Sequence, residues 1–212
     1  SMPFFILMIA SFFFSCGGSV TSENTGSAAA GTTSPARGAV VKYNVDTKAS
    51  VVSWRASMLL GVNAHTGYIY FSRGELLTEN GQFAGATLEV DMNTMEDDHH
   101  RADNNLIKHL KDPDFFDVKK FPYSSISTTR VESTTGQDKK ITGNLTIKGI
   151  SNPVSFPAKL EITDGLLNAN GRLVIDRTKW GVHYKSGKFF DLLADQTMSD
   201  SIEFQIKIVA RK

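Results

Sequence analysis

Apolar and polar residues alternate with a period of two along most of the chain after Gly38, and β-branched and aromatic residues fill many of the apolar positions. The spacing is clear in residues 154–162 and again in residues 202–208. Because successive side chains of a strand point to opposite faces, each such segment has one dry and one wet face. The pattern predicts an antiparallel β domain that closes into a barrel or stacks as a sandwich, since a single sheet would leave its dry face exposed.

Two dipeptides give the clearest turn signals between the alternating segments. Asn80-Gly81 and Asp164-Gly165 suit tight type I′ turns, in which both central residues need a positive φ. We therefore expect a β-hairpin at each of them.

Residues 97–110 break the alternation and predict a helix that ends before Pro113. Leu106, Ile107 and Leu110 lie at helical spacing and form an apolar edge able to cover one end of a barrel. Acidic residues near the start and basic residues near the end of this segment suit the helix dipole. Residues 180–198 are also irregular, and we expect a long loop or short helix there, near a barrel mouth.

The first 38 residues differ in composition from the rest. Residues 3–14 are almost wholly apolar and lead into Ser15-Cys16, which is typical of the h-region of a secretory leader and shorter than the roughly 20 residues of a membrane span. The segment resembles a bacterial lipoprotein signal, in which the cysteine becomes lipidated; a plain secretory signal with an incidental cysteine is the alternative. The Gly-, Ser-, Thr- and Ala-rich stretch that follows predicts a tether. We thus expect a signal segment at 1–16, a tether at 17–38 and a barrel domain at 39–212, anchored to a membrane through Cys16.

Charge and cysteine content exclude several classes of protein. The 23 Lys and Arg residues nearly balance the 22 Asp and Glu residues, so the formal net charge of +1 gives no broad field for nucleic acid. Cys16 is the only cysteine, so the chain can form neither an internal disulfide nor a thiolate metal cage.

Residues 96–103 are the one segment that suggests metal or enzyme chemistry. Imidazole and carboxylate groups bind zinc, and His99 with Asp103 would share a face of the expected helix. Adjacent histidines such as His99 and His100 diverge on a helix, however, and a charged helix start accounts for the acids. The chain also has no Gly-x-Ser-x-Gly elbow and no phosphate-binding Gly-rich loop. We predict no catalytic residue and no metal site.

Residues 176–180 carry positive charge, together with Lys185 and Lys188. These groups could meet the phosphate of a ligand or a membrane headgroup. We expect a solvated basic loop instead, because isolated surface charges usually have no further role.

Several motifs resemble the YceI-like family of envelope proteins, over Tyr43 to Ala210. The run from His109 to Pro122 is similar to the family's His-Leu, Asp-Phe-Phe-Asp and Pro signature, and residues 141–149 with 152–154 resemble its Gly-x-Leu-Thr-Ile-x-Gly hairpin. Upstream, Gly67, Ile69, Phe71 and Gly74 are similar to its early Gly-x-aromatic strand.

This resemblance implies an all-β fold with a minor helix, an eight-stranded antiparallel lipocalin-like β-barrel capped by a short α-helix. It also implies non-enzymatic binding, storage or transport of an isoprenoid lipid, such as a polyprenyl phosphate or quinone, with no other cofactor, in the periplasm or on the surface of the bacterial envelope. The oligomeric state stays open, a homodimer included.

Alternation alone does not separate residues that line a cavity from residues that fill a core, since a barrel of about eight strands can hold a slim ligand or be plugged by its own side chains. The competing hypotheses are a metal-dependent enzyme centred on His99 and His100, and a structural surface module with a filled barrel. The expected lining residues are Trp54, Val90, Met92, Leu106, Leu110, Phe115, Phe116, Leu145, Ile147, Phe156, Leu160, Leu173, Ile175, Trp180, Phe204 and Ile206.

Overall fold

The computed structural model describes residues 38–212, so the expected leader, the Cys16 anchor and nearly all of the tether lie outside the described part. The described part is mostly β-strand, with one short α-helix, and none of its helices is long and apolar enough to span a membrane. Its elements are β1 (Val40–Val45), β2 (Val51–Ala56), β3 (His65–Glu79), β4 (Gln82–Asp97), α1 (Asn105–Lys111), β5 (Tyr123–Ser133), β6 (Asp138–Ile147), β7 (Ile150–Thr163), β8 (Leu166–Asp176), the 3-10 helix η1 (Arg177–Trp180) and β9 (Ser201–Arg211).

The strands form one antiparallel sheet that closes on itself. Neighbours run in the order β3, β2, β9, β8, β7, β6, β5 and β4, and pairing of β4 with β3 closes the ring. β1 and β2 together occupy one strand position between β3 and β9. β2 pairs with residues 65–69 of β3 and 203–207 of β9, and β1 pairs with residues 75–79 of β3 and 210–211 of β9. The expected eight-stranded barrel is therefore confirmed, with one of its strands interrupted.

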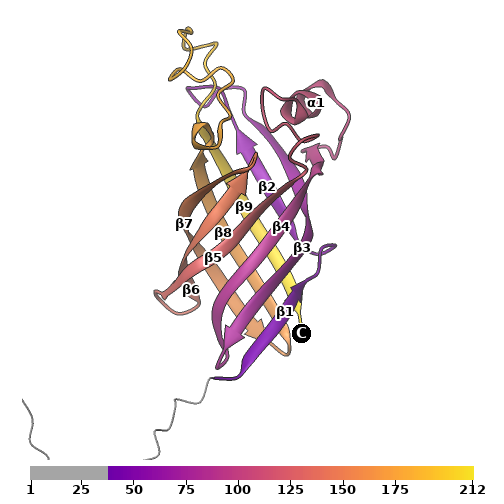
Figure 1. The fold of residues 1–212 in the computed structure, drawn as a ribbon, viewed down its shortest axis with the longest axis vertical. Coiled ribbons are helices and arrows are strands. Elements are labelled where there is room, and N and C mark those ends of the chain that lie inside the picture. Colours follow the sequence, from indigo (N-terminus) through magenta and orange to yellow (C-terminus); the bar gives the residue numbers. More distant parts are fainter. Residues whose placement is uncertain (1–37) are drawn as a thin grey trace, which may run out of the picture. The chain divides into compact units, whose positions relative to one another are not determined.

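The two ends of the barrel differ. The base end carries the β3–β4, β5–β6 and β7–β8 turns, and the mouth end carries α1, η1 and the loops that follow β2 and η1 (Figure 1). The two hairpins predicted from sequence are confirmed at the base, with positive φ at Asn80 and Gly81 and at Asp164 and Gly165. A third such pair, Lys148-Gly149, joins β6 to β7 at the mouth, within the segment that resembles the family's hairpin.

The predicted start of the helix is wrong. Asp97 ends β4, and the chain then turns before Asn104 caps α1 by accepting a hydrogen bond from the Ile107 amide at 2.9 Å. An Asn at this position satisfies an amide that lacks a partner in the first turn, so the helix starts there and not at the acids. The expected basic last turn and the end before Pro113 are confirmed.

Buried side chains fill the base half of the barrel. Leu76 and Thr78 from β3 are about 1% exposed, and Leu167 from β8 and Ala210 from β9 are fully buried. Tyr43 from β1 lies over the same region, opposite Leu76. The base half is therefore filled by the barrel's own side chains, which pack densely there.

The barrel wall is split towards the mouth between β7 and β8. Their pairing begins only at Ala158 and Gly171, so the mouth half of β7 pairs only with β6 and that of β8 only with β9. The ring of Phe156 lies against Gly171, where an added Cβ would come within 3.1 Å of it. Gly171 thus leaves room for an aromatic side chain at the point where the two strands separate.

Candidate ligand-binding cavity

The mouth half of the barrel encloses a cavity of about 130 Å³. Side chains on the inner faces of several strands line it, and Leu110 from α1 and Phe116 from the following loop cover it at the mouth. The residues that line it are Val52, Trp54, Ala56, Ile69, Phe71, Leu88, Val90, Met92, Met95, Leu110, Phe116, Ser124, Ser125, Ile126, Leu145, Ile147, Leu173, Ile202, Phe204 and Ile206.

Most of the lining residues expected from sequence lie around this cavity, which fits the alternation of inward and outward positions on each strand. Their role in holding a ligand stays a prediction. They are Trp54, Val90, Met92, Leu110, Phe116, Leu145, Ile147, Leu173, Phe204 and Ile206.

Three of the expected residues pack at the mouth and do not line the cavity. Phe115 contacts the rings of His109 and Tyr184, at centroid distances of 5.0 and 4.9 Å, and so docks α1 against the loop after η1. Trp180 is buried and its indole Nε1–H donates to the Leu145 carbonyl at 2.9 Å, which joins η1 to the end of β6. Leu106 is half-buried against the core on the first turn of α1.

The other three expected residues that do not line the cavity belong to β7 and β8. Leu160 is buried in the base half, below the cavity, and Ile175 is buried at the end of β8. Phe156 occupies the split beside Gly171. A period of two identifies the inward face of a strand, but it does not give the height of a residue along the barrel, so sequence reasoning placed these with the others.

Sequence reasoning missed several residues of the wall. Ile69 and Phe71 belonged to a motif that carried the family resemblance, and Val52 and Ala56 continue the alternation through Trp54, so the signal was present for these. Met95 and the serines of β5 gave no such signal, because neither type marks an inward strand position. The missed residues are Val52, Ala56, Ile69, Phe71, Leu88, Met95, Ser124, Ser125, Ile126 and Ile202.

The residues of the wall include few polar side chains, namely Trp54 and two serines of β5. Trp54 is 7% exposed, and its buried Nε1–H has no hydrogen-bond partner in the described part of the chain. The Ser124 hydroxyl donates only to the Met92 sulfur, at 3.1 Å, and a thioether is a weak acceptor. Among the described residues that line the cavity, none is charged. The surface of the cavity is therefore apolar and suits an uncharged hydrocarbon group, with the Trp54 N–H buried behind it.

Gly67 fixes the position of the Trp54 ring. The two residues face each other on β3 and β2, and a Cβ at Gly67 would lie 2.4 Å from the Trp54 ring and 2.1 Å from the Glu96 carbonyl oxygen. Any larger residue would push the indole away from β3. The glycine of this family motif is thus explained in this barrel, because the backbone of β3 at Gly67 lies directly against the Trp54 indole.

The basic segment after β8 is only partly a free cationic surface, because Lys179 and Lys185 are exposed whereas Arg177 and Lys188 are held by other groups. Arg177 is 1% exposed, and its guanidinium donates to the carbonyls of Ser199 and Val182 at 3.0 and 2.8 Å. Burial lowers the pKa of Arg177, and the nearby carboxylates of Asp200 and Asp176 oppose that effect. Lys188 pairs with the same two carboxylates, at 2.6 Å to Asp176 and 3.3 Å to Asp200. The expectation of a solvated loop is wrong for Arg177, which holds the loop to the end of the barrel.

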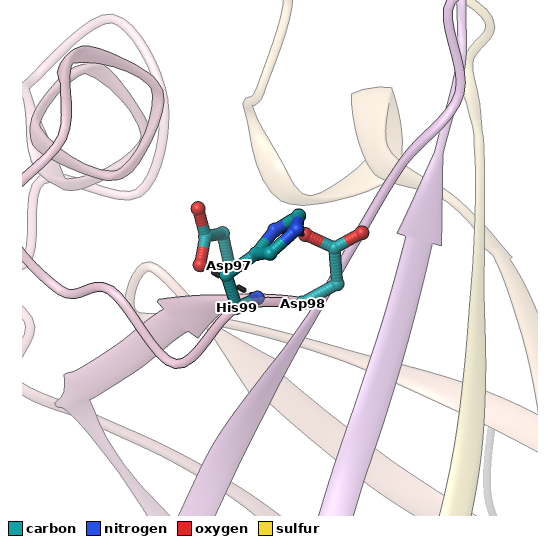
Figure 2. Close-up of side chains that lie close together, drawn as sticks. All are labelled: Asp97, Asp98 and His99. Carbon is teal, nitrogen blue, oxygen red and sulfur yellow. Dashed lines mark hydrogen bonds and ion pairs between the residues drawn. The ribbon is translucent and has the colours of Figure 1, made fainter.

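The acidic and histidine cluster lies in the turn after β4. Ligand atoms of Asp97, Asp98 and His99 come within 4.8 Å of one another, and Figure 2 shows the His99 ring beside the Asp98 carboxylate, with Nδ1 to Oδ1 at 2.7 Å. His99 and Asp103 do not share a helical face, because both precede α1. His100 turns to Glu96, at 2.6 Å, and stacks on Tyr68.

Asp97 is committed to holding this turn together. One of its carboxylate oxygens accepts from the amides of His99 and Arg101, both at 2.9 Å, and the other accepts from the Arg101 guanidinium at 2.8 Å and from Asn104 at 2.7 Å. The Arg101 side chain above all lowers the pKa of Asp97 to about 2. A carboxylate with both oxygens occupied is a structural anchor, so the arrangement gives the metal hypothesis no support.

Comparison with known proteins places the barrel among relatives. Residues 43–210 match the family model described as YceI-like domain. A UPF0312 protein of Enterobacter is 39% identical over 77 residues, which are 36% of this chain and 38% of that protein. A UPF0312 protein of Pseudomonas putida is 30% identical over 126 residues, 55% of this chain and 60% of that protein. The alignments thus span less than two thirds of the length of these relatives.

Solved structures share the fold. The crystal structure of Burkholderia cenocepacia BcnA superposes with a TM-score of 0.63 at 22% identity and covers 78% of this chain and 98% of its own. A polyisoprenoid binding domain from Saccharophagus degradans gives a TM-score of 0.56 at 12% identity, with 80% and 97% covered. At such identities the similarity establishes the fold alone.

Proposed function

The chain belongs to the YceI-like family, and from this membership we propose that its barrel binds an amphiphilic isoprenoid lipid without changing it chemically. The observation that carries the proposal is the apolar cavity in the mouth half, walled by side chains from seven strands and covered by Leu110 and Phe116. Burial of a hydrocarbon there would gain about 25 cal/mol for each Å² removed from water. The structural neighbour from Saccharophagus degradans, described as a polyisoprenoid binding domain, supports the same class of ligand.

The present size of the cavity sets how a long chain would fit. A volume of about 130 Å³ is comparable with the roughly 150 Å³ cavity that holds one benzene ring in another protein. It therefore accepts about one isoprene unit as it stands. Met92 and Met95 line it, and their unbranched side chains can change rotamer to lengthen the space. The rest of a longer chain would extend past Leu110 and Phe116 at the mouth.

The wall also bears on the polar end of the ligand. A phosphate enclosed in the cavity would meet no positive charge, and burying an unpaired charge is costly. A carbonyl could instead accept from the Trp54 Nε1–H, which lacks a partner in the described part of the chain, if the indole turns this buried group towards the ligand. We therefore propose that a quinone-type head can enter the cavity, whereas the head of a polyprenyl phosphate stays at the mouth, in water.

The role in the cell follows as part of the same proposal. A barrel of this kind stores or carries its lipid within the bacterial envelope, and the leader-like segment ending at Cys16 is the feature that suggests attachment to a membrane. Neither catalysis nor a bound metal is needed for such a role.

Solvent extraction of the purified chain, followed by mass spectrometry, tests the proposal together with titration of a short, soluble prenyl compound. We expect a co-purifying prenyl lipid and saturable binding. Ala56→Leu should weaken binding on the order of tenfold, which corresponds to about 1.4 kcal/mol, because it fills part of the cavity. Val174→Leu, on the exposed face of β8, is the matched control and should leave binding unchanged. If no prenyl lipid co-purifies and none binds on titration, the proposal is wrong.

A further inference from the structure

Large apolar side chains gather in water at the barrel mouth. Leu59, Leu60 and Val62 in the loop after β2 are 44, 78 and 55% exposed, and Phe189, Phe190 and Leu193 in the loop after η1 are 51, 48 and 68% exposed. We call these six residues the mouth patch. The other large exposed apolar side chains of the described part are spread along the strands. Single exposed residues are ordinary, but a group of this kind marks an interaction surface.

A tight turn presents the first half of the mouth patch. The Gly61 amide donates to the Met58 carbonyl at 3.0 Å, which makes Leu59 and Leu60 the two central residues of the turn. Gly61 follows with φ at +74°, a conformation that suits glycine. The Met58 amide donates to the Val62 carbonyl at 3.1 Å and closes the loop. Leu60 is therefore held at the tip by backbone geometry.

The two loops form one surface. The Leu59 amide donates to the Thr197 carbonyl at 2.8 Å, and Met58 and Met198 form an isolated β-bridge. Thr197 in turn donates through its amide and hydroxyl to the Leu193 carbonyl, at 3.0 and 2.9 Å. Hydrogen bonds thus link Leu59 to Leu193 across the two loops.

The mouth patch lies close along the chain to residues that line the cavity. Ala56 and Ile202 line the cavity, and each lies only a few residues from the linked pair Met58 and Met198. A lipid that leaves the cavity over this edge would meet apolar side chains and not open water. Figure 1 shows the loop after η1 extending beyond the barrel end, next to the loop after β2.

Charge and shape decide which partner fits this surface. Residues 57–64 carry no charge, although 21% of the chain is charged, and Lys188 at the base of the second loop is already paired. Asp191 and Asp195 are exposed near the patch and would disfavour an anionic surface. A protruding tip also lacks the broad, self-complementary face that a twofold dimer needs. The uncharged apolar tip of the loop after β2 suits the outer part of a bilayer, where Leu and Phe enter readily and charges do not.

We propose that the mouth patch inserts into the surface of a lipid bilayer and aligns the barrel mouth with it, so that lipid passes between bilayer and cavity. The passage of lipid rests on the proposed function, whereas the insertion does not. Insertion would depend on apolar contact, so it should need no anionic lipid and should not weaken when salt is added.

A tryptophan placed at the tip tests insertion in the full chain. The two native tryptophans, Trp54 and Trp180, are 7 and 2% exposed and so are shielded from the bilayer. Leu60→Trp is mixed with phosphatidylcholine vesicles whose acyl chains carry bromine, a contact quencher of indole emission. We expect a blue shift and a loss of emission in Leu60→Trp. Val174→Trp, at a 48% exposed position on β8, is the matched control and should show neither, even if the N-terminal segment also holds the chain on the vesicle.

Each other outcome overturns the insertion. Emission of Leu60→Trp unaffected by the vesicles excludes it, and equal quenching at positions 60 and 174 shows unspecific adhesion. A blue shift without vesicles that grows with protein concentration assigns the patch to a second copy. Quenching only when phosphatidylglycerol is added shows electrostatic adsorption. Titration with the soluble prenyl compound is run on the same sample, so that failure of insertion and failure of lipid binding are seen separately.

Discussion

At the scale of single residues, the features that bear on function are groups whose hydrogen-bonding capacity is unused. Trp54 fills the space left by Gly67, and its ring lines the cavity while its buried N–H has no partner among the described residues. Asp97 is the opposite case, because every contact of its carboxylate is used to hold the turn after β4. A buried donor left unpaired lowers stability unless a ligand uses it, so Trp54 is a candidate for ligand recognition and Asp97 for structure.

We expect Trp54→Phe to keep the fold and to weaken binding of prenyl compounds that carry a carbonyl. A hydrogen bond contributes about 0.5–1.5 kcal/mol, so the dissociation constant should rise roughly two- to tenfold. Titration calorimetry with a short prenyl quinone measures the change. The matched ligand is the corresponding prenyl hydrocarbon, which has no acceptor and whose affinity should change less. An equal loss for both ligands would mean that only the shape of the indole matters.

Asp97 should make the turn after β4 sensitive to acid. Its pKa in the folded chain is about 2, below the ordinary value of 3.8, so the unfolded chain binds the proton more readily. The stabilisation is fully present above pH 3.8 and is lost as the pH falls through 2. Urea denaturation across this range measures it. In Asp97→Asn the dependence should be shallower, because the amide does not titrate in this range and so removes the contribution of the Asp97 carboxyl. An unchanged slope would assign the acid sensitivity to other groups.

At the scale of elements, the tight turns set the register of the barrel. Gly81 and Gly149 both have positive φ, but a Cβ at Gly81 would meet open space and one at Gly149 would lie 2.7 Å from the Phe121 ring. The turn between β6 and β7 therefore packs, at Gly149, directly against Phe121 in the segment that leads into β5.

Gly149→Ala should destabilise the chain more than Gly81→Ala does. Left-handed backbone costs a residue with a Cβ about 1–2 kcal/mol, and at Gly149 the displacement of Phe121 adds to that strain. Gly85→Ala is the control, since its Cβ would make only ordinary contacts at 3.5 Å with Thr128 and its φ is not positive. Thermal or urea denaturation compares the three variants. Equal losses at Gly81 and Gly149 would show that Phe121 adjusts without cost.

The period of two predicted the β-strands and which of their faces point inward, and the Asn-Gly and Asp-Gly pairs predicted two hairpins. Both are local signals that the sequence alone provides. Sequence reasoning misplaced the start of α1, since acidic residues favour a helix start in general while the cap depends on which side chain reaches the Ile107 amide. It also could not separate Trp180 from Trp54. Both are buried, but the indole of Trp180 bonds to a strand end that is distant in sequence, whereas that of Trp54 faces a cavity.

At the scale of the whole described domain, the barrel divides into a packed base and a hollow mouth. Leu76, Leu167 and Ala210 are almost completely buried at the base, while the cavity, the split between β7 and β8 and the mouth patch all belong to the other half. Stability and binding therefore depend on different parts of one sheet. A change that loosens the mouth need not unfold the barrel, which is the condition for a carrier that must open to exchange lipid.

The split between β7 and β8 has a kinetic consequence. Amides on the mouth halves of these strands lack cross-strand partners on one side, so they should exchange their hydrogens with solvent through small local openings. Amides around Leu167 and Ala210, which are paired with each other across β8 and β9, should exchange only when the whole domain unfolds. The sheet would then contain two cooperative units, the base half and the mouth half. Local opening would be confined to the mouth half, which encloses the cavity.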